Sequence, residues 1–259
     1  MTLAVNTWII ANRELRGLLH TPLAWATLSL VGALLAWLFL LQLDQYQAYR
    51  SQLLNLSNPP GVTQLLVTPF FSSAGMILML VLPMLTMRSF AEQQRDQTLP
   101  LLMTAPISLT SIVLGKFFGI CSFIAVLLSL LIAMPLSLLV ATPLDFGLLA
   151  SATAAITLLG ASFTAVGLWT SSLTRHPAVA ATTGLGLLLI LWFLSAAGKN
   201  SQGGYASDAL LPLLSTRYHF TELLSGWVAS ADIAYFVILT TLMLGLTVLR
   251  LHSQRYQRH

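Results

Sequence analysis

A Gly-x-Ser sequence within a long apolar run is the pattern in this chain that most resembles a catalytic motif. It is GASF, residues 160–163, and Ser162 would be the nucleophile of an intramembrane serine protease. Such a serine needs a base close enough to accept its proton. The histidines lie at the ends of apolar runs, in loops or in the tail, at His20, His176, His219, His252 and His259. None is placed to activate a serine in mid-run, so we interpret the small residues between 160 and 167 as a face for close helix packing.

Nucleotide and metal chemistry are not indicated either. A phosphate-binding loop has the pattern Gly-x4-Gly-Lys-Ser/Thr. The two Gly-Lys pairs, at 115–116 and 198–199, are followed by Phe and Asn and lack the earlier glycine. With a single cysteine, Cys121, the sequence has no pair for an intrachain disulfide and no cysteine-based metal site. We therefore expect no cofactor in this chain, and any ATP and magnesium that drive it must be bound by a separate subunit.

The composition is that of an integral membrane protein. Hydrophobic residues make up 56% of the chain and charged residues 8%, against roughly 25% charged residues in a soluble domain, and the mean hydropathy is +0.82. Ten-residue segments of alternating polarity do not occur, so helices must satisfy the backbone polar groups in the bilayer. We expect an all-α fold with one transmembrane domain over residues 1–259. Its six spans are predicted at about 22–43, 68–88, 109–138, 146–172, 178–197 and 232–250.

Positive charges are distributed unevenly among the segments between these spans. With both termini in the cytoplasm, the basic residues inside are Arg13, Arg16, Arg88, Arg95, Lys116, Arg175, Arg250, Arg255 and Arg258, and those outside are Arg50, Lys199 and Arg217. This asymmetry follows the positive-inside rule. We therefore expect a multi-pass membrane protein with both termini cytoplasmic. The formal net charge of +4 is a topology signal, and no basic patch indicates a nucleic-acid partner.

Ionisable residues are absent from the centres of the predicted spans. Asp145 and Asp232 fall at outer edges, and Arg88 and Lys116 fall near inner edges, where long side chains reach the interface. An ion-driven transporter keeps an ionisable group within its spans, because that group carries the coupling. The sequence therefore disfavours secondary transport.

Two long segments lie on the outer side, at 44–67 and 198–231. The second contains apolar residues that would share one helical face, namely Leu213, Leu214, Tyr218, Leu223 and Leu224. That face would rest on the bilayer or on a partner, and a short surface helix that shields the bundle is the simpler interpretation.

The most polar long stretch, residues 88–109, separates the second and third spans. No Gly or Pro occurs from Met87 to Arg95, so we expect the second span to continue as a helix into the cytoplasm. Thr98 is suited to cap a short apolar helix at about 99–104, which Pro106 ends. Its apolar side chains would enter either the headgroup layer or a groove on a cytoplasmic partner, and the residues alone favour neither.

A family resemblance bears on this choice. Residues 83–119 read PMLTMRSFAEQQRDQTLPLLMTAPISLTSIVLGKFFG. They resemble the signature of type-2 ATP-binding-cassette (ABC-2) permeases, P-x-x-T-M-R-x-F-x-E-E-x-x-x-G-T-L-E-L-L-L-T-x-P-[IV]-S, which continues to a Gly-Lys. Residues 13–25 look like the amphipathic N-terminal helix of that family, and 167–181 and 217–236 are similar to later parts of it. The subfamily it resembles includes the gliding-motility permease and the copper-processing permease of nitrous oxide reductase maturation.

The resemblance implies an ATP-driven export permease of the bacterial inner membrane. It would pair with a copy of itself or with a related permease, within membrane lipid, and bind two cytoplasmic ABC ATPase subunits. The short helix at 99–104 would be the coupling helix, seated in a groove of the ATPase. The residues implied in ATPase coupling are Glu92, Arg95, Asp96, Thr98, Leu99, Leu101, Leu102, Met103, Thr104 and Pro106.

Three residues depart from the family pattern. Gln93 replaces its second acid, Gln97 replaces its glycine, and Pro100 replaces its second glutamate. The contacts with an ATPase would differ at these positions. The subfamily also implies an alternative function, in which ATP moves an accessory envelope protein without transport of a substrate. The outer segments 44–67 and 198–231 would then contact the accessory protein.

Overall fold

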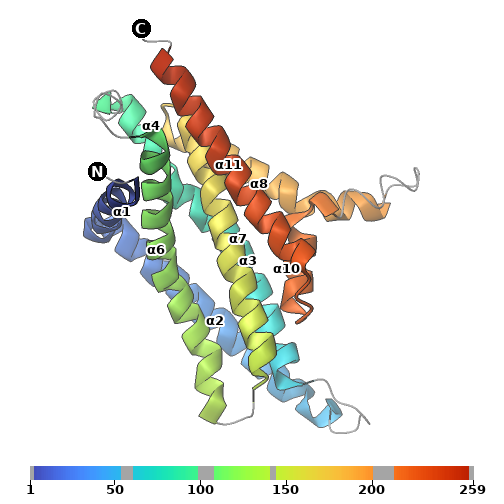
Figure 1. Cartoon of the computed structure of the whole chain (residues 1–259). Coiled ribbons are helices and arrows are strands. Elements are labelled where there is room, and N and C mark those ends of the chain that lie inside the picture. Colours follow the sequence, from blue (N-terminus) through green and yellow to red (C-terminus); the bar gives the residue numbers. More distant parts are fainter. Residues whose placement is uncertain (1–2, 54–60, 99–107, 141–143, 201–212, 257–259) are drawn as a thin grey trace.

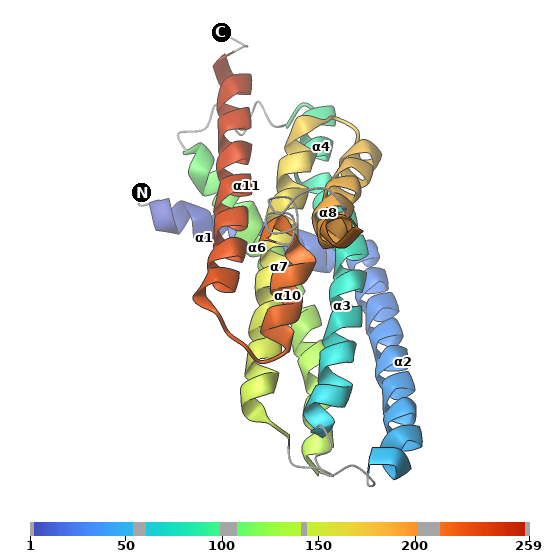
Figure 2. The same ribbon diagram turned by 90° about the vertical axis from the view of Figure 1, so that its right-hand side faces the viewer.

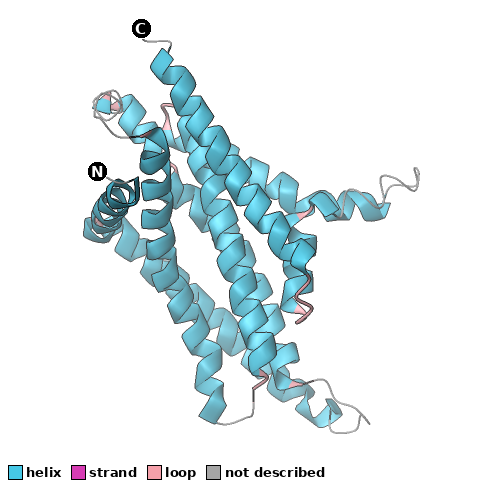
Figure 3. Ribbon diagram, viewed as in Figure 1, coloured by secondary structure: helices cyan, strands magenta, loops and turns pink. Residues whose placement is uncertain are grey.

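The computed structural model describes residues 3–53, 61–98, 108–140, 144–200 and 213–256, and in these ranges every regular element is a helix (Figures 1 and 3). The elements are α1 Leu3–His20, α2 Pro22–Leu53, α3 Val62–Thr86, α4 Arg88–Arg95, α6 Leu109–Leu136, the 3-10 helix η1 Ser137–Val140, α7 Phe146–Leu173, α8 Pro177–Asn200, α10 Thr216–Leu224 and α11 Ser230–Tyr256. Stretches long and apolar enough to cross a membrane are Ala24–Ala48, Thr63–Arg95, Leu109–Leu139, Phe146–Leu173, Pro177–Leu194 and Ser230–Arg255. The predicted all-α membrane fold with six spans is confirmed.

The spans differ in how much of their surface other helices cover. The apolar windows of α3 and α7 are each 50% buried and that of α6 is 44% buried, whereas α2, α8 and α11 are only 22% buried. The helix α7 packs against α3, α6, α8, α10, α11 and α4, so it is the central helix of the bundle. Its small residues make this possible: a methyl group at Gly167 would collide with Thr86 of α3. The predicted small-residue packing face is therefore confirmed.

The two ends of the bundle are distinct. We call the end that carries α4, the start of α6 and the end of α7 the α4 end, and the opposite end the distal end (Figure 1). Figures 1 and 2 show both chain termini nearer the α4 end than the distal end. Helices at the distal end are longer than expected, since α2 continues to Leu53 and α3 begins at Val62. Both helices thus extend into the predicted outer segment 44–67, because the polar residues after Asp44 include good helix formers.

The helix α1 lies across α6 in close contact. A methyl group added at Gly115 would be 2.6 Å from Cβ of Ile10, and one at Gly119 would be 2.7 Å from Cβ of Glu14. Two glycines four residues apart lie on the same face of α6, which lets the helix axes approach closely. The chain then turns at Thr21, whose hydroxyl donates to the carbonyl of Leu18 (2.7 Å) before α2 begins.

The helix α10 covers the bundle with one face and leaves its other face exposed, in line with the predicted short surface helix. It packs against α7, α8, α11 and α3. Its Phe220 ring lies 5.9 Å from the ring of Trp192 in α8, which in turn lies 6.4 Å from Phe163 in the middle of α7. Figures 1 and 2 show α8 inclined steeply to the other spans, so that its far part reaches the start of α10.

The predicted apolar face of this region was wrong. Leu223 and Leu224 are buried, whereas Leu213, Leu214 and Tyr218 are exposed. The physical reason is a break at Ser215, which precedes α10 as its N-cap and takes Leu213 and Leu214 out of helical register with the rest. The buried face of α10 is Thr216, His219, Phe220, Leu223 and Leu224.

Candidate functional site

A serine of α7 separates α4 from α3. The Ser171 hydroxyl donates to the carbonyl of Met87 (2.8 Å) and accepts the amide of Ala91 (3.1 Å). These two groups would bond each other in a continuous helix, so the hydroxyl is inserted into the helical ladder. It also accepts the amide of Phe90 (3.1 Å) and thereby caps the start of α4. The predicted helix from 87 to 95 is present, with this interruption at Met87.

The end of α7 is held in return by α4. The side-chain amide of Gln94 donates to the carbonyl of Ser172 (2.9 Å), which lies in the last turn of α7. Carbonyls in a last helical turn have no partner within their own helix, so this contact satisfies one of them. Ser89, Phe90 and Ala91 of α4 are buried. One face of α4 is therefore fixed to the central helix.

A buried ion pair joins α1 to α6 beside α4. The Lys116 ammonium lies 3.3 and 3.4 Å from the two carboxylate oxygens of Glu14. The Lys116 side chain is 3% exposed and that of Glu14 is 23% exposed. The same ammonium lies 5.1 Å from the centre of the Phe90 ring, at a distance typical of a cation–π contact. The prediction that Lys116 only reaches the interface was incomplete, because α1 supplies a partner for it.

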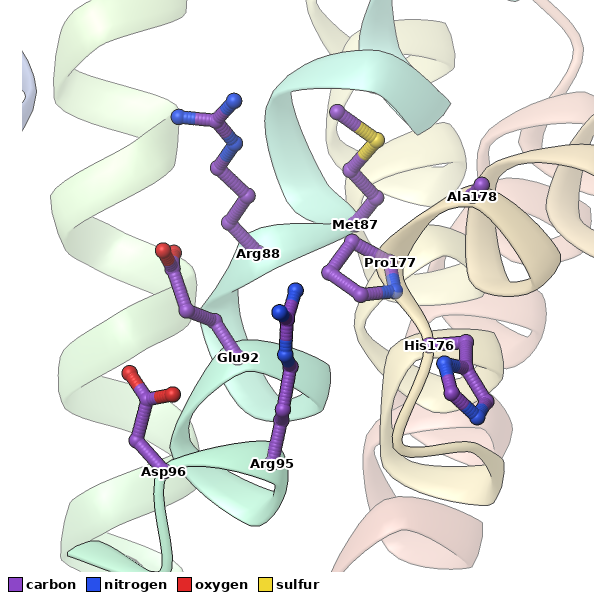
Figure 4. A pocket seen from close by; sticks show the side chains of 8 residues that line it. All are labelled: Met87, Arg88, Glu92, Arg95, Asp96, His176, Pro177 and Ala178. Atoms are coloured by element: carbon purple, nitrogen blue, oxygen red, sulfur yellow. The ribbon is translucent and has the colours of Figure 1, made fainter.

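The other face of α4 carries exposed charges between two cavities. Arg88, Glu92 and Asp96 recur every four residues and line both cavities, one of about 630 Å³ and one of about 470 Å³. Figure 4 shows these three side chains leaving α4 toward the same side, while Arg95 rises between Glu92 and Pro177. The larger cavity extends to His176 and Pro177 at the turn between α7 and α8, and the smaller one to α1 and Lys116.

The helix α4 thus packs on the central span with one face and presents its charged face at the mouths of two cavities. Residues 8–255 match a family model described as ABC-2 family transporter protein. The chain belongs to this ABC-2 family. It is therefore a multi-pass membrane permease of the ABC transporter type, a component that works with ABC ATPase subunits and is generally not itself catalytic. No curated protein matches the sequence.

The permease presents four of the residues predicted for ATPase coupling on the described surface. Glu92, Arg95, Asp96 and Thr98 are all exposed. The Thr98 hydroxyl donates to the carbonyl of Gln93 (3.4 Å). The other six, Leu99, Leu101, Leu102, Met103, Thr104 and Pro106, lie outside the described residues. The short helix at 99–104 and its groove remain predictions.

The departure from the family pattern at Gln97 has a structural meaning. Gln97 has a φ of 53°, in the left-handed region that favours glycine. It follows Asp96, which caps the end of α4 through a bond from its amide to the carbonyl of Glu92 (2.8 Å). Helices commonly end on such a left-handed residue. Gln97 thus adopts a conformation that the glycine of the family pattern would adopt more readily.

Interactions that sequence reasoning missed connect residues far apart in the chain. Ser171 and Met87 are 84 positions apart, and Lys116 and Glu14 are 102 apart. For the second pair, the sequence offered two indications: a single acidic residue on α1 and a lysine between two glycines of α6. Ser162 donates to the carbonyl of Leu159 in its own helix (2.8 Å), in line with its interpretation as a packing residue. Among the described residues no group of three or more His, Cys, Asp or Glu is placed to hold a metal ion.

Proposed function

We propose that this permease couples ATP hydrolysis by separate ABC ATPase subunits to export across the bacterial inner membrane, with the α4 end in the cytoplasm. The observation that carries the proposal is the attachment of α4 to α7 through Ser171 and Gln94, while its charged face stays exposed. A force applied to the exposed face would reach the central helix directly. The ATPase subunits bind ATP and magnesium, and this chain binds neither.

Two routes lead from α4 into the bundle. The first runs through Ser171 to α7, which also packs on α10 toward the distal end. The second runs from Phe90 to Lys116 of α6 and then to Glu14 of α1. Both routes run through buried or partly buried side chains, which would transmit displacement because close-packed interiors deform little.

The surface for the ATPase is formed by the exposed residues of α4 and by the segment that follows. Glu92, Arg95 and Asp96 offer charges of both signs, and a complementary partner surface would fix the docking geometry. Residues 99–104 act as the coupling helix, with Leu99, Leu101, Leu102 and Met103 in a groove of the ATPase. The poorly buried spans α2, α8 and α11 face lipid or a second permease, either an identical or a related chain.

Co-purification tests the coupling surface. In the double variant Leu101→Asp and Leu102→Asp, charged residues replace the two central leucines, and we expect the ATPase to be lost from the purified complex. The single variant Ser253→Asp serves as control, because it adds a negative charge to an exposed residue of α11 at the same end. Unchanged recovery of the ATPase with the double variant would contradict the coupling role.

The alternative function is a device that moves an accessory envelope protein without transporting a substrate. The observation that favours it is the position of α10, which packs on the same helix that holds α4. The outer segments 44–67 and 198–231 would contact that accessory protein. Structures of the complex with and without ATP distinguish the two functions: a polar or lipid-sized path between two permeases in either state supports export, and a closed interior in both states supports movement alone.

A further inference from the structure

A buried His-Asp pair joins α10 to α11 in the distal half of the bundle. Nδ1 of His219 lies 2.6 Å from Oδ1 of Asp232, and the two side chains are 6% and 7% exposed. Nε2 of the same ring lies 2.8 Å from the carbonyl oxygen of Leu213. Both nitrogens of one imidazole ring are therefore within hydrogen-bond distance of an oxygen atom. Neither the family assignment nor the proposed ATPase coupling uses this pair.

These contacts determine how many protons the pair holds. The Leu213 carbonyl can only accept, so Nε2 carries a hydrogen. Nδ1 then either donates a second hydrogen to an ionised Asp232 or accepts one from a protonated carboxyl group. In both arrangements the pair holds one proton more than a neutral imidazole beside a carboxylate. Hydrogen bonds at both ring nitrogens are satisfied together only when the pair holds this added proton.

Few groups near the ring offer an alternative partner for this proton. The titratable groups that face it are Asp232, the Tyr235 ring stacked on it at 4.2 Å and the Tyr218 ring, which contacts it edge-on at 5.4 Å. Glu222, one turn further along α10, is partly exposed, and Arg217 is exposed.

The packed neighbours of α10 carry no compensating charge. The sequences of α3 and α7 contain no charged residue or histidine. Neither does α8 up to Leu194, where the description of its side chains ends, and α11 has only Asp232 before Arg250. Ionisable residues within a membrane domain are rare and mark functional sites. Within the described parts of these neighbouring helices, Asp232 is thus the charged residue that α10 contacts.

The same contacts hold the start of α10 in place. The helical register is interrupted at Ser215. Just before this residue, the Leu213 carbonyl oxygen lies within hydrogen-bond distance of His219. The Leu214 carbonyl accepts a hydrogen bond from the Tyr235 hydroxyl (2.9 Å). Loss of the added proton would leave a nitrogen lone pair facing either the carboxylate or the Leu213 carbonyl. A buried polar group without its hydrogen bond destabilises the structure that holds it.

We propose that His219 and Asp232 form a proton-binding site that controls the docking of α10 in the bundle. With the proton bound, α10 is held against α11, α7 and α8. Release of the proton loosens α10 and exposes its buried face. The site is independent of the ATPase, so its test applies to the permease alone and its failure leaves the proposed coupling unaffected.

Cysteine labelling measures the docking directly. The full chain is placed in nanodiscs with Cys121→Ser, and Leu224→Cys provides a buried reporter, since Leu224 is 1% exposed. A second reporter, Thr221→Cys, lies on the exposed side of the same helix and corrects for the intrinsic pH dependence of the thiol reaction. The ratio of the two maleimide labelling rates is measured from about pH 5 to about pH 8, where histidine contacts titrate. We expect a severalfold rise of this ratio as the pH increases.

Variants separate proton binding from simple support of the fold. Asp232→Asn and His219→Gln each remove the titrating pair, and we expect the ratio to become independent of pH in both. Tyr235→Phe keeps the pair and the ring stack but loses the hydroxyl bond, so it should raise the ratio at every pH without moving the midpoint. His176→Gln, at the α4 end, should leave the profile unchanged. A flat ratio in the Cys-reporter parent, or an unaltered pH profile in Asp232→Asn or His219→Gln, would overturn the proposal.

Discussion

The Ser171 hydroxyl lies 2.8 Å from the Met87 carbonyl oxygen, so a side chain of α7 sits within the helical ladder that runs from α3 into α4. The Ser171 hydroxyl oxygen also accepts a hydrogen bond from the amide of Ala91, so the direction of α4 depends on the position of α7. Under the proposed coupling, a displacement of α4 would therefore reach the helix that packs on most of the bundle.

Replacement of this serine should loosen α4. In Ser171→Ala the amides of Phe90 and Ala91 lose a buried acceptor, which lowers stability by about 1–2 kcal/mol, as for loss of a helix N-cap. ATP hydrolysis by the complex should respond less to the permease, because α4 is no longer tied to α7. Thermal unfolding of the purified permease and ATPase assays of the complex measure the two effects. Ser122→Ala, which removes an exposed hydroxyl bonded to its own helix, should change neither.

The pair Glu14 and Lys116 should show energetic coupling. Glu14→Gln leaves the Lys116 ammonium buried without its carboxylate and should destabilise the permease by roughly 1.5–3 kcal/mol, the range for hydrogen bonds to charged groups. The double variant Glu14→Gln with Lys116→Met removes the buried charge and should recover part of this loss. A double-mutant cycle on chemical unfolding measures the interaction. Strictly additive effects of the two changes would argue against the pair.

Close packing of α1 on α6 predicts different effects for two glycine substitutions. Gly115→Ala places a methyl group against Ile10 and should cost about 1–3 kcal/mol, as overpacking of a core does. Gly245→Ala in α11 has no atom within 4 Å of the new methyl group and should be stabilising by roughly 0.5–1 kcal/mol. Thermal unfolding of both variants provides the comparison, and equal effects would show that α1 does not pack on α6 in the membrane.

The left-handed residue after α4 allows a stabilising change. Gln97→Gly relieves the conformation at φ 53° and should raise stability by about 1 kcal/mol. Gln97→Val should lower it, because a β-branched side chain is strained there. If unfolding temperatures of the two variants do not differ, the turn is not formed in solution.

The local composition of the sequence was sufficient to predict the six spans. Long apolar runs such as 146–172 must be helical in a bilayer, because no water is present to bond the backbone, and the structure has a helix over Phe146–Leu173. The small residues of that run also indicated its packing role, since only they allow close approach of helices. Helix ends were less predictable: α2 continues past its apolar part to Leu53.

Only the tertiary structure decided which polar groups meet. The sequence placed His219 outside the spans, in the outer segment 198–231, and gave no partner for it, yet it is buried against Asp232. The partners of Ser171 and Lys116 lie on helices whose relative rotation and depth no single segment encodes. The sequence by itself determined which segments enter the membrane, because transfer free energy depends on the residues of each segment. The contacts of α4 and α10 depend on how several helices pack together, and the folded bundle alone decides that.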